Sequence, residues 1–279
     1  MAPNPRGLSI ANNEEEIDAL RGHENMTSAT TTQPIGPLVE FHSAKRPERV
    51  TLEGRWTTLA PLDAERHAAE LYAASHGAGR DSVWTYLPYG PFANLASFAA
   101  DIELKARSVD PQFFAVIDNG SSRAVGFQSL MRIDPANRVI EVGHVMYTPA
   151  MQRTARATEA QYLFAQYVFD ALGNRRYEWK CDNLNAPSKR AAGRFGLTFE
   201  GVFRQHMIVK GRNRDTAWFA MLDVEWPARK AAYERWLSPD NFDADGRQRQ
   251  RLSELMPKAR AGDHGGDADV LARRRNADR

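Results

Sequence analysis

The chain has 279 residues, a length that suits one large domain or two small ones. Hydrophobic residues make up 42% of it, and the formal net charge of +2 gives no global basic field, which argues against a nucleic-acid partner. Its one cysteine, Cys181, excludes an internal disulfide and a multi-cysteine metal site. No apolar run approaches the roughly 18 residues of a membrane helix, and no secretory signal is recognisable. We therefore expect a cytoplasmic protein without a membrane partner.

Composition divides the chain into three parts. Residues 1–45 are small and polar, and they bury too little apolar surface to offset the entropy of ordering, so a flexible N-terminal segment is expected. Residues 46–238 carry the periodic patterns of a folded domain. Residues 239–279 are rich in Asp, Arg and Gly, which predicts a flexible polar tail with room for a short helix near 248–256.

The first half of the folded part predicts strands and two helices around an aromatic loop at residues 84–92. Asp63 caps a helix that runs to Ser75. The other elements expected here are a strand at Val50–Leu59, a helix at Asn94–Ser108, and strands at Gln112–Ile117, Val125–Ile133 and Val139–Tyr147. Short turns join the last three strands, which indicates an antiparallel meander.

The second half predicts alternating helices and strands. The expected elements are a helix at Thr154–Leu172, a strand at Tyr177–Cys181, a helix at Asn185–Phe195, strands at Leu197–Val209 and Thr216–Val224, and a last helix opened by Pro227. The complete order is β-α-α-β-β-β-α-β-α-β-β. It predicts an α/β fold with one mixed, mostly antiparallel central sheet flanked by helices.

The junction at residues 150–160 is the strongest local signal, because an apolar strand ends at Pro149 and a helix opens directly after it. The free backbone N–H groups and the positive dipole end of such a helix bind anions. Arg153 and Arg156 add charge in the same turn. No Walker loop and no Gly-x-Gly-x-x-Gly run is present. The alternative interpretation is an ordinary helix start with two solvated arginines.

The same junction resembles that of the GCN5-related N-acetyltransferases, in particular the branch that acetylates ribosomal-protein N-termini. That branch carries Gln/Arg-x-x-Gly-x-Gly/Ala, often followed by Thr-Glu-Ala. Gln152, Ala155 and Ala157 occupy the defining positions, and Thr158 and Glu159 continue the pattern. Further matches to the family lie at Asn185, Ser188, Arg190, Arg194, Gly196, Glu200 and Gly201, and in the turn with Gly211, Arg214 and Asp215.

The resemblance implies a GNAT-like fold and acetyl-CoA as cosubstrate, with no metal. The residues that it implies for CoA binding are Val145, Tyr147, Gln152, Arg153, Thr154, Ala155, Arg156, Ala157, Thr158, Asn185 and Arg190. One departure is Ala155, which stands where the family usually has a glycine that lets the backbone approach the pyrophosphate closely. This departure keeps a non-catalytic acyl-CoA-binding or regulatory protein open as an alternative.

The resemblance implies two catalytic residues. Glu141 is expected to act as the general base that deprotonates the incoming ammonium; the alternative is a structural glutamate paired with Arg132 or Arg138. Strand alternation places the rival base, His144, on the opposite sheet face from Glu141. Ser188 is expected to protonate the departing thiolate, or alternatively to cap its helix.

The acceptor is expected to meet an aromatic loop. Trp84, Tyr86, Tyr89 and Phe92, with His144, are the predicted substrate-binding residues, and the alternative is that these aromatic rings only pin the loop to the core. Charges near the last hairpin, at Arg204, His206, Arg212 and Arg214, would favour an acidic acceptor unless they are simply solvated.

The function expected from all these features is N-acetyltransfer from acetyl-CoA to a primary amine, on a protein N-terminus or a small molecule, by direct attack in a ternary complex. A third possibility is an interaction protein that acts through its flexible ends. The sequence does not specify the acceptor, and it is compatible with a homo-oligomer.

Overall fold

The computed structural model describes residues 33–40 and 42–257. Contacts divide the chain into a unit of residues 1–41 and a unit of residues 42–279. In the first unit, residues 33–40 are exposed and form no helix or strand. The second unit begins before residue 46, because the N–H of Ala44 donates to the carbonyl of Pro135 and that of Lys45 to the carbonyl of Leu172. Most of the predicted N-terminal segment, and the predicted tail beyond residue 257, lie outside the described residues.

One eight-stranded sheet organises the second unit, in the order β1-β2-β3-β4-β5-β6-β8-β7. Its strands are β1 (Leu52–Glu53), β2 (Thr57–Pro61), β3 (Gln112–Asp118), β4 (Arg123–Asp134), β5 (Val139–Tyr147), β6 (Arg176–Asp182), β7 (Thr198–Val209) and β8 (Arg212–Leu222). Among these neighbouring pairs only β5 and β6 run parallel. The prediction of a mixed, mostly antiparallel sheet is therefore confirmed.

The single strand predicted at Val50–Leu59 is wrong in detail, because a tight turn splits it into β1 and β2. The buried carboxylate of Glu159 holds this turn by accepting the backbone N–H groups of Arg55, Trp56 and Thr57 at 2.8, 2.7 and 2.8 Å. The approach is so close that a Cβ on Gly54 would lie 2.5 Å from the carboxyl carbon of Glu159. Glu159 therefore ties the first strands to the helix that follows β5.

The helices of the described residues are α2 (Ala64–Ser75), α3 (Leu95–Arg107), α4 (Ala155–Gln166), α5 (Ala186–Arg194), α6 (Trp226–Leu237) and α7 (Leu252–Leu255). The helices α2 to α5 begin at the residues that open the predicted helices. Side chains of Asp63, Asn94, Thr154 and Asn185 accept backbone N–H groups at the starts of α2 to α5. The helix predicted to reach Leu172 continues past α4 as one π-helical turn, Tyr167–Ala171. Short 3-10 turns lie at Asp81–Trp84, Asp223–Glu225 and Pro239–Asn241.

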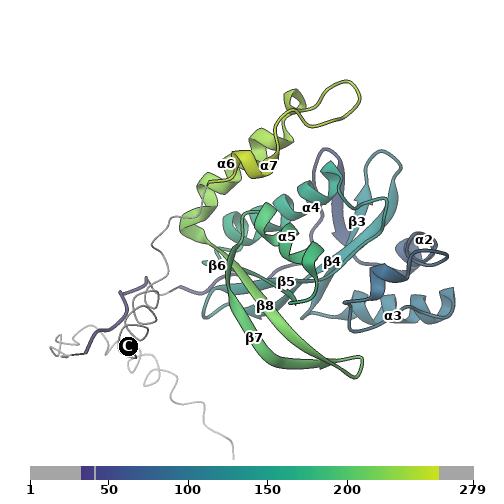
Figure 1. The fold of residues 1–279 in the computed structure, drawn as a ribbon, viewed down its shortest axis with the longest axis horizontal. Coiled ribbons are helices and arrows are strands. Elements are labelled where there is room, and N and C mark those ends of the chain that lie inside the picture. Colours follow the sequence, from purple (N-terminus) through teal and green to yellow (C-terminus); the bar gives the residue numbers. More distant parts are fainter. Residues whose placement is uncertain (1–32, 41, 258–279) are drawn as a thin grey trace, which may run out of the picture. The chain divides into compact units, whose positions relative to one another are not determined.

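The two faces of the sheet carry separate hydrophobic clusters. The main core joins one face to α4, α5 and α6, and includes Phe114, Ile140, Phe164 and Tyr177. The second core joins the other face to α2 and α3 and includes Phe98, Ile102, Phe113 and Phe127. Figure 1 shows α2 and α3 side by side, away from α4 and α5. Below, the two faces are called the α4 face and the α3 face.

Residues 239–257 belong to the segment predicted as a polar tail, and in the structure they fold back on α6. Phe242 packs edge-on against Trp236 and Trp56, with ring centroids 5.2 Å apart in both pairs. Leu252 of α7 is fully buried in the main core. Within residues 33–40 and 42–257, none of the helices combines the length and the apolar character that a membrane span requires.

Candidate functional site

The parallel strands β5 and β6 stay paired for only part of their length. Their Cα partners run from Val139 opposite Arg176 to Val142 opposite Trp179. Beyond that point β5 continues beside β4 as far as Tyr147, whereas β6 continues beside β8 as far as Asp182. The two strands therefore part after Val142. The edge of β5 that carries the predicted residues Val145 and Tyr147 has no strand partner on the β6 side.

The N-terminus of α4 lies directly after this unpaired edge. Thr154 caps the helix, since its hydroxyl accepts the N–H of Ala157 at 3.4 Å and donates to the carbonyl of Met151 at 2.6 Å. The side-chain amide of Gln152 donates to the carbonyl of Tyr147 at 2.9 Å, which ties the turn to the end of β5. Arg153 has a left-handed backbone with φ of +61° and is exposed. The first turn of α4 thus offers N–H groups to an anion, and the exposed Arg153 just before its cap, which has no ion pair with the described residues, offers a positive charge.

Other predicted CoA residues of this turn face the protein. Arg156 pairs with Asp118 of β3, with 2.8 Å between Nε and Oδ1. The methyl of Ala155 packs against the main core. Ala157 and Thr158 are buried, and the hydroxyl of Thr158 accepts a hydrogen bond from Arg194 at 2.9 Å. Arg194, one of the residues that match the family, is thus linked to this turn through Thr158.

On the far side of the opening, the start of α5 faces β6. Asn185 caps the helix by accepting the N–H of Ser188 at 3.1 Å. The hydroxyl of Ser188 in turn accepts the indole N–H of Trp179 at 2.9 Å, and it donates its own hydrogen toward the sulfur of Cys181. Cys181 is buried, and burial raises the pKa of its thiol. Arg190 lies exposed on α5. The side chain that caps α5 is therefore that of Asn185.

Glu141 of β5 is 5% exposed. The residues directly before and after it in the strand belong to the main core on the α4 face, so the side chain of Glu141 lies on the α3 face. Its Oε2 lies 2.9 Å from the ammonium of Lys180 and 3.2 Å from Nε of Arg132. Burial raises the pKa of the Glu141 carboxyl, and the attraction to Lys180 and Arg132 opposes that rise. Of the two predicted ion-pair alternatives, Arg132 is in contact. Lys180 was not foreseen, although the alternation of Tyr177–Cys181 places it on the face opposite the core.

His144 corrects the expectation from strand alternation. Its backbone has φ of +50°. The pairing register between β4 and β5 differs between the residues before His144 and those after it. This β-bulge turns His144 onto the α3 face, the same face as Glu141, where the ring stacks on Tyr89 and approaches Phe113. Burial, with the nearby charges of Lys105, Arg132 and Arg214, lowers the pKa of His144 to about 4. The ring is therefore neutral at neutral pH.

The aromatic loop divides into buried and accessible residues. Trp84 is 1% exposed, and its indole N–H donates to the carbonyl of Ser75, so its ring belongs to the core and pins the loop. Phe92 packs on Trp84 and Phe98. Tyr86 is 36% exposed, and its hydroxyl donates to the carbonyl of Leu184 just before α5. Of the predicted acceptor residues on this loop, Tyr86 and Tyr89 are placed to line an open surface.

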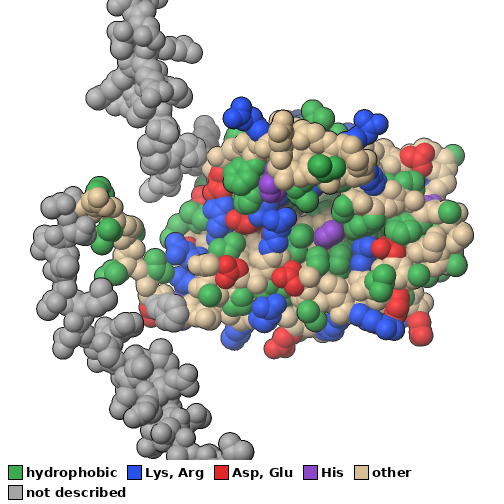
Figure 2. Space-filling model, turned by 90° about the horizontal axis from the view of Figure 1, so that it is seen from below, with side chains coloured by type: hydrophobic (Ala, Val, Ile, Leu, Met, Phe, Trp, Pro, Cys, Tyr) green, Lys and Arg blue, Asp and Glu red, His purple; other side chains and the backbone are tan. Residues whose placement is uncertain are grey.

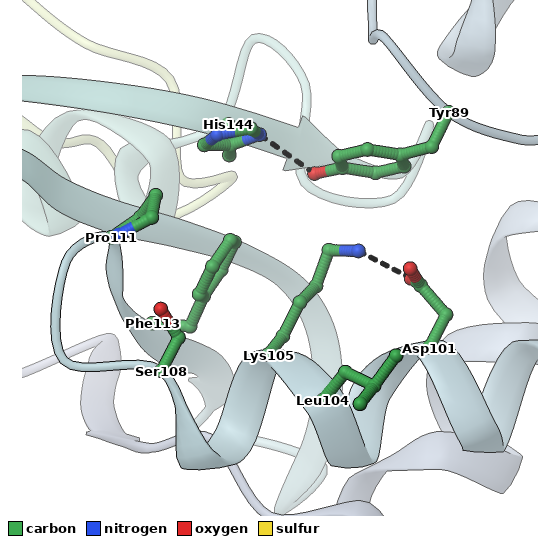
Figure 3. A pocket seen from close by; sticks show the side chains of 8 residues that line it. All are labelled: Tyr89, Asp101, Leu104, Lys105, Ser108, Pro111, Phe113 and His144. Carbon is green, nitrogen blue, oxygen red and sulfur yellow. Dashed lines mark hydrogen bonds and ion pairs between the residues drawn. The ribbon is translucent and has the colours of Figure 1, made fainter.

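Tyr89 and His144 line a cavity of about 240 Å³ between α3, β3 and β5. Figure 3 shows their hydrogen bond, 3.1 Å from Nδ1 of His144 to the Tyr89 hydroxyl, above the side chain of Lys105. The ammonium of Lys105 pairs with Asp101 and lies 3.7 Å from the centre of the Tyr89 ring. Sequence reasoning missed Lys105, which reads as an ordinary residue in the last turn of α3.

The α3 face continues across β8 and the bulged middle of β7. Four successive β7 residues, Phe203–His206, line an open hollow of about 590 Å³. Viewed from below, the molecule has a hollowed surface where histidine, Lys and Arg side chains lie among hydrophobic ones (Figure 2). Within the described part of the chain, no group of three His, Cys, Asp or Glu side chains could hold a metal ion.

Comparison with known proteins identifies the class. Residues 57–198 match the family described as the acetyltransferase (GNAT) domain. A GCN5-related N-acetyltransferase from Brucella melitensis is 54% identical and superposes with a TM-score of 0.75, over 77% of this chain and 97% of that one. A probable acetyltransferase of the GNAT family from Chromobacterium violaceum is 43% identical with a TM-score of 0.64, over 71% of this chain and 100% of that one.

The chain therefore belongs to the GNAT acetyltransferase family, as the motif resemblance predicted. The microcin C7 self-immunity acetyltransferase MccE, whose structure contains acetyl-CoA and AMP, shares the fold at 21% identity and a TM-score of 0.53, over 61% of this chain and 93% of that one. No curated protein is significantly similar to this chain.

Proposed function

We propose that the protein transfers the acetyl group of acetyl-CoA to a primary amine by direct attack within a ternary complex. The observation that carries this proposal is the parting of β5 and β6 after Val142, directly before the N-terminus of α4. The opening offers unpaired strand edge to an extended amide-bearing chain, and the helix start offers N–H groups to a pyrophosphate. MccE, a more distant relative, has been seen with acetyl-CoA on the same fold.

In this proposal the first turn of α4 holds the pyrophosphate. Arg153 supplies the free positive charge, while Gln152 and Thr154 fix the shape of the turn through their contacts with Tyr147 and Met151. The methyl of Ala155 is partly buried and packs against the main core. In this proposal its presence in place of the family's glycine does not prevent phosphate binding.

Glu141 is the proposed general base. An ammonium must lose a proton before its nitrogen can attack the thioester carbonyl, and a buried carboxylate with a raised pKa is suited to accept that proton, directly or through water. His144 is the weaker candidate, because a ring with a pKa of about 4 has little affinity for a proton at neutral pH. Backbone N–H groups of the unpaired β5 edge are available to stabilise the developing oxyanion.

Ser188 is the proposed acid for the leaving thiolate. Its oxygen accepts the indole N–H of Trp179, and its hydrogen, which is directed at Cys181, would turn to the CoA sulfur as the carbon–sulfur bond breaks. The products are then the N-acetylated amine and CoA with a free thiol.

The test is to mix the protein with acetyl-CoA and a panel of primary amines, following free-thiol release and the mass of the acetylated amine. A thermal shift with CoA is measured in parallel. Thiol release that depends on the amine supports transfer, and the Glu141→Gln protein should show much less. CoA binding with no transfer to any amine would favour the non-catalytic alternative, and no CoA binding at all would reject both.

A further inference from the structure

The α3 face beside Glu141 carries a cation for which the enzyme has no counter-charge. Arg214 lies on β8, two residues before Thr216 and four before Trp218. Ala217 and Phe219 of the same strand point into the main core. Side chains alternate along a strand, so Arg214, Thr216 and Trp218 point to the α3 face. Trp218 is opposite Lys180 on β6, whose ammonium contacts Glu141. Arg214 thus lies on the surface that continues from the proposed base.

Neighbouring cations of this face are paired, and Arg214 is not. Lys180 lies between Glu141 and Glu178, Arg132 contacts Glu141, and Lys105 contacts Asp101. Among the residues described, Arg214 has no ion pair, and its Nε is buried without a hydrogen-bond partner. The indole nitrogen of Trp218 is likewise buried and unpartnered. Buried donors are almost always satisfied in folded proteins, so two such donors on one face indicate a missing acceptor.

Positive charges of several residues act near these donors. Arg132 and Arg214 act on both His144 and His206, and after burial they contribute to lowering the pKa of each ring. Lys105 contributes to this effect at His144, and Lys180 contributes to it at His206. Of these cations, Arg132 is already bound to Glu141.

There is also room for a small molecule. The hollow lined by Phe203–His206 adjoins β8, because His206 meets the Thr216 hydroxyl at 2.9 Å from Nδ1. Phe203 lies against Trp218, with ring centroids 4.4 Å apart, and gives the hollow an aromatic wall.

We infer that the acceptor is a primary amine that also carries an anionic group, a carboxylate or a phosphate, and that Arg214 binds this group while the amine faces Glu141. The inference rests on the proposed function and names its substrate class. An arginine fork suits either anion, because both present paired oxygens. The phosphates of CoA are the other anions in the system, but the proposed pyrophosphate site is the start of α4, whose free cation is Arg153.

The experiment compares amines in matched pairs that differ only in charge. β-Alanine is measured against β-alaninamide, and phosphoethanolamine against ethanolamine, each by thiol release at saturating acetyl-CoA with the product confirmed by mass. The enzyme is tested as wild type, as Arg214→Gln, and as Arg214→Lys, which keeps the charge but loses the fork. Arg66→Gln is the matched control, since Arg66 is an exposed arginine of α2 that has no place in the proposed acceptor site.

The expected result is a higher kcat/KM for the anionic member of at least one pair. A preference for β-alanine indicates a carboxylate, and a preference for phosphoethanolamine indicates a phosphate. Arg214→Gln should lower kcat/KM for that member by roughly tenfold to a hundredfold, the size of a hydrogen bond to a charged group. It should leave the neutral member unchanged, and Arg214→Lys should fall between. Thermal melting of each variant shows whether it is folded, and unchanged turnover of the neutral member is a second check.

Three results would overturn the inference. Equal use of charged and neutral amines would do so while leaving the proposed transfer intact. An equal loss for both members of a pair in Arg214→Gln would show that Arg214 only supports the fold. Transfer to none of the four amines, with CoA bound, would count against the proposed function and against this inference together.

Discussion

The ammonium of Lys180 lies 2.9 Å from the carboxylate of Glu141, and the same nitrogen lies 2.7 Å from that of Glu178. The buried ammonium of Lys180 thus pairs with two buried carboxylates on adjacent strands, but the pKa values of these carboxyls shift in opposite directions. Burial raises the pKa of Glu141 in spite of its cations. Burial also acts on Glu178, but hydrogen bonds from Lys180 and Arg176 outweigh it and lower the pKa. Neighbouring acids with opposite shifts commonly mark different roles, and the raised one is suited to proton transfer.

Replacing Glu141 by Gln should lower kcat at neutral pH by at least about tenfold, because an amide cannot accept the ammonium proton and a general base contributes about 10²–10⁴-fold. CoA affinity, measured by calorimetry, should stay near that of the wild type. Part of the lost rate should return at high pH as more free amine forms. His144→Asn is the control and should do much less. If the two variants exchange their effects, His144 is the base and Glu141 is structural.

Replacing Lys180 by Met should move the acid side of the pH profile to higher pH. Lys180 favours the charged form of Glu141, so its loss raises the pKa of that carboxyl further. The base must be ionised, and activity is therefore lost as pH falls through this pKa. The measurement is kcat/KM against pH with two amines of different pKa, because a limb that stays fixed between them belongs to the enzyme. Lys189→Met, which removes a lysine bound to Asn183, should leave the limb in place.

Much of the fold followed from the sequence because local signals agreed with the tertiary structure. Asp63, Asn94 and Asn185 are residues with strong capping preference, and helices begin where they stand. The two short strands β1 and β2 were missed for a nonlocal reason. Their turn is held by Glu159, about 100 residues away in the chain, and no property of residues 50–61 specifies that contact.

The start of α4 directly after β5 followed from the sequence, but several contacts around it did not. Strand alternation failed at His144, because the left-handed backbone of a bulge shifts the following side chains by one position. The ion pair between Glu141 and Lys180 was also missed. It joins the neighbouring strands β5 and β6, which are separated in the sequence by α4, so no local pattern predicts it.

Replacing Arg153 by Glu should weaken CoA binding clearly, because it sets a negative charge beside the proposed pyrophosphate position. Arg156→Gln should have a smaller effect, since the guanidinium of Arg156 is already neutralised by Asp118. Isothermal calorimetry with CoA is the measurement. The matched control is Arg66→Glu, a reversal at an exposed arginine in the first turn of α2. Wild-type affinity in the Arg153 variant would remove this turn from the binding site.

Replacing Glu159 by Gln should lower the free energy of unfolding by about 2–4 kcal/mol. The carboxylate accepts three backbone N–H groups in a buried setting, and an amide directs its own N–H groups at some of them. Urea unfolding followed by circular dichroism measures the change. Glu65→Gln, at an exposed position in α2, should change it by less than about 0.5 kcal/mol. A stability loss as small as that of the control would mean that the turn is held by other contacts.

Replacing Ala155 by Gly restores the residue that the family usually has, and it should leave CoA affinity unchanged. The reason is that the methyl of Ala155 is partly buried and packs on the main core. The stability should fall by about 1 kcal/mol or less, from lost helix propensity and lost packing. Ala186→Gly is the control, because Ala186 is also the first residue of its helix but is exposed. The amount by which Ala155→Gly lowers the free energy of unfolding more than this control does is the contribution of the methyl packed on the core. A tenfold gain in CoA affinity would show instead that the methyl obstructs the cosubstrate.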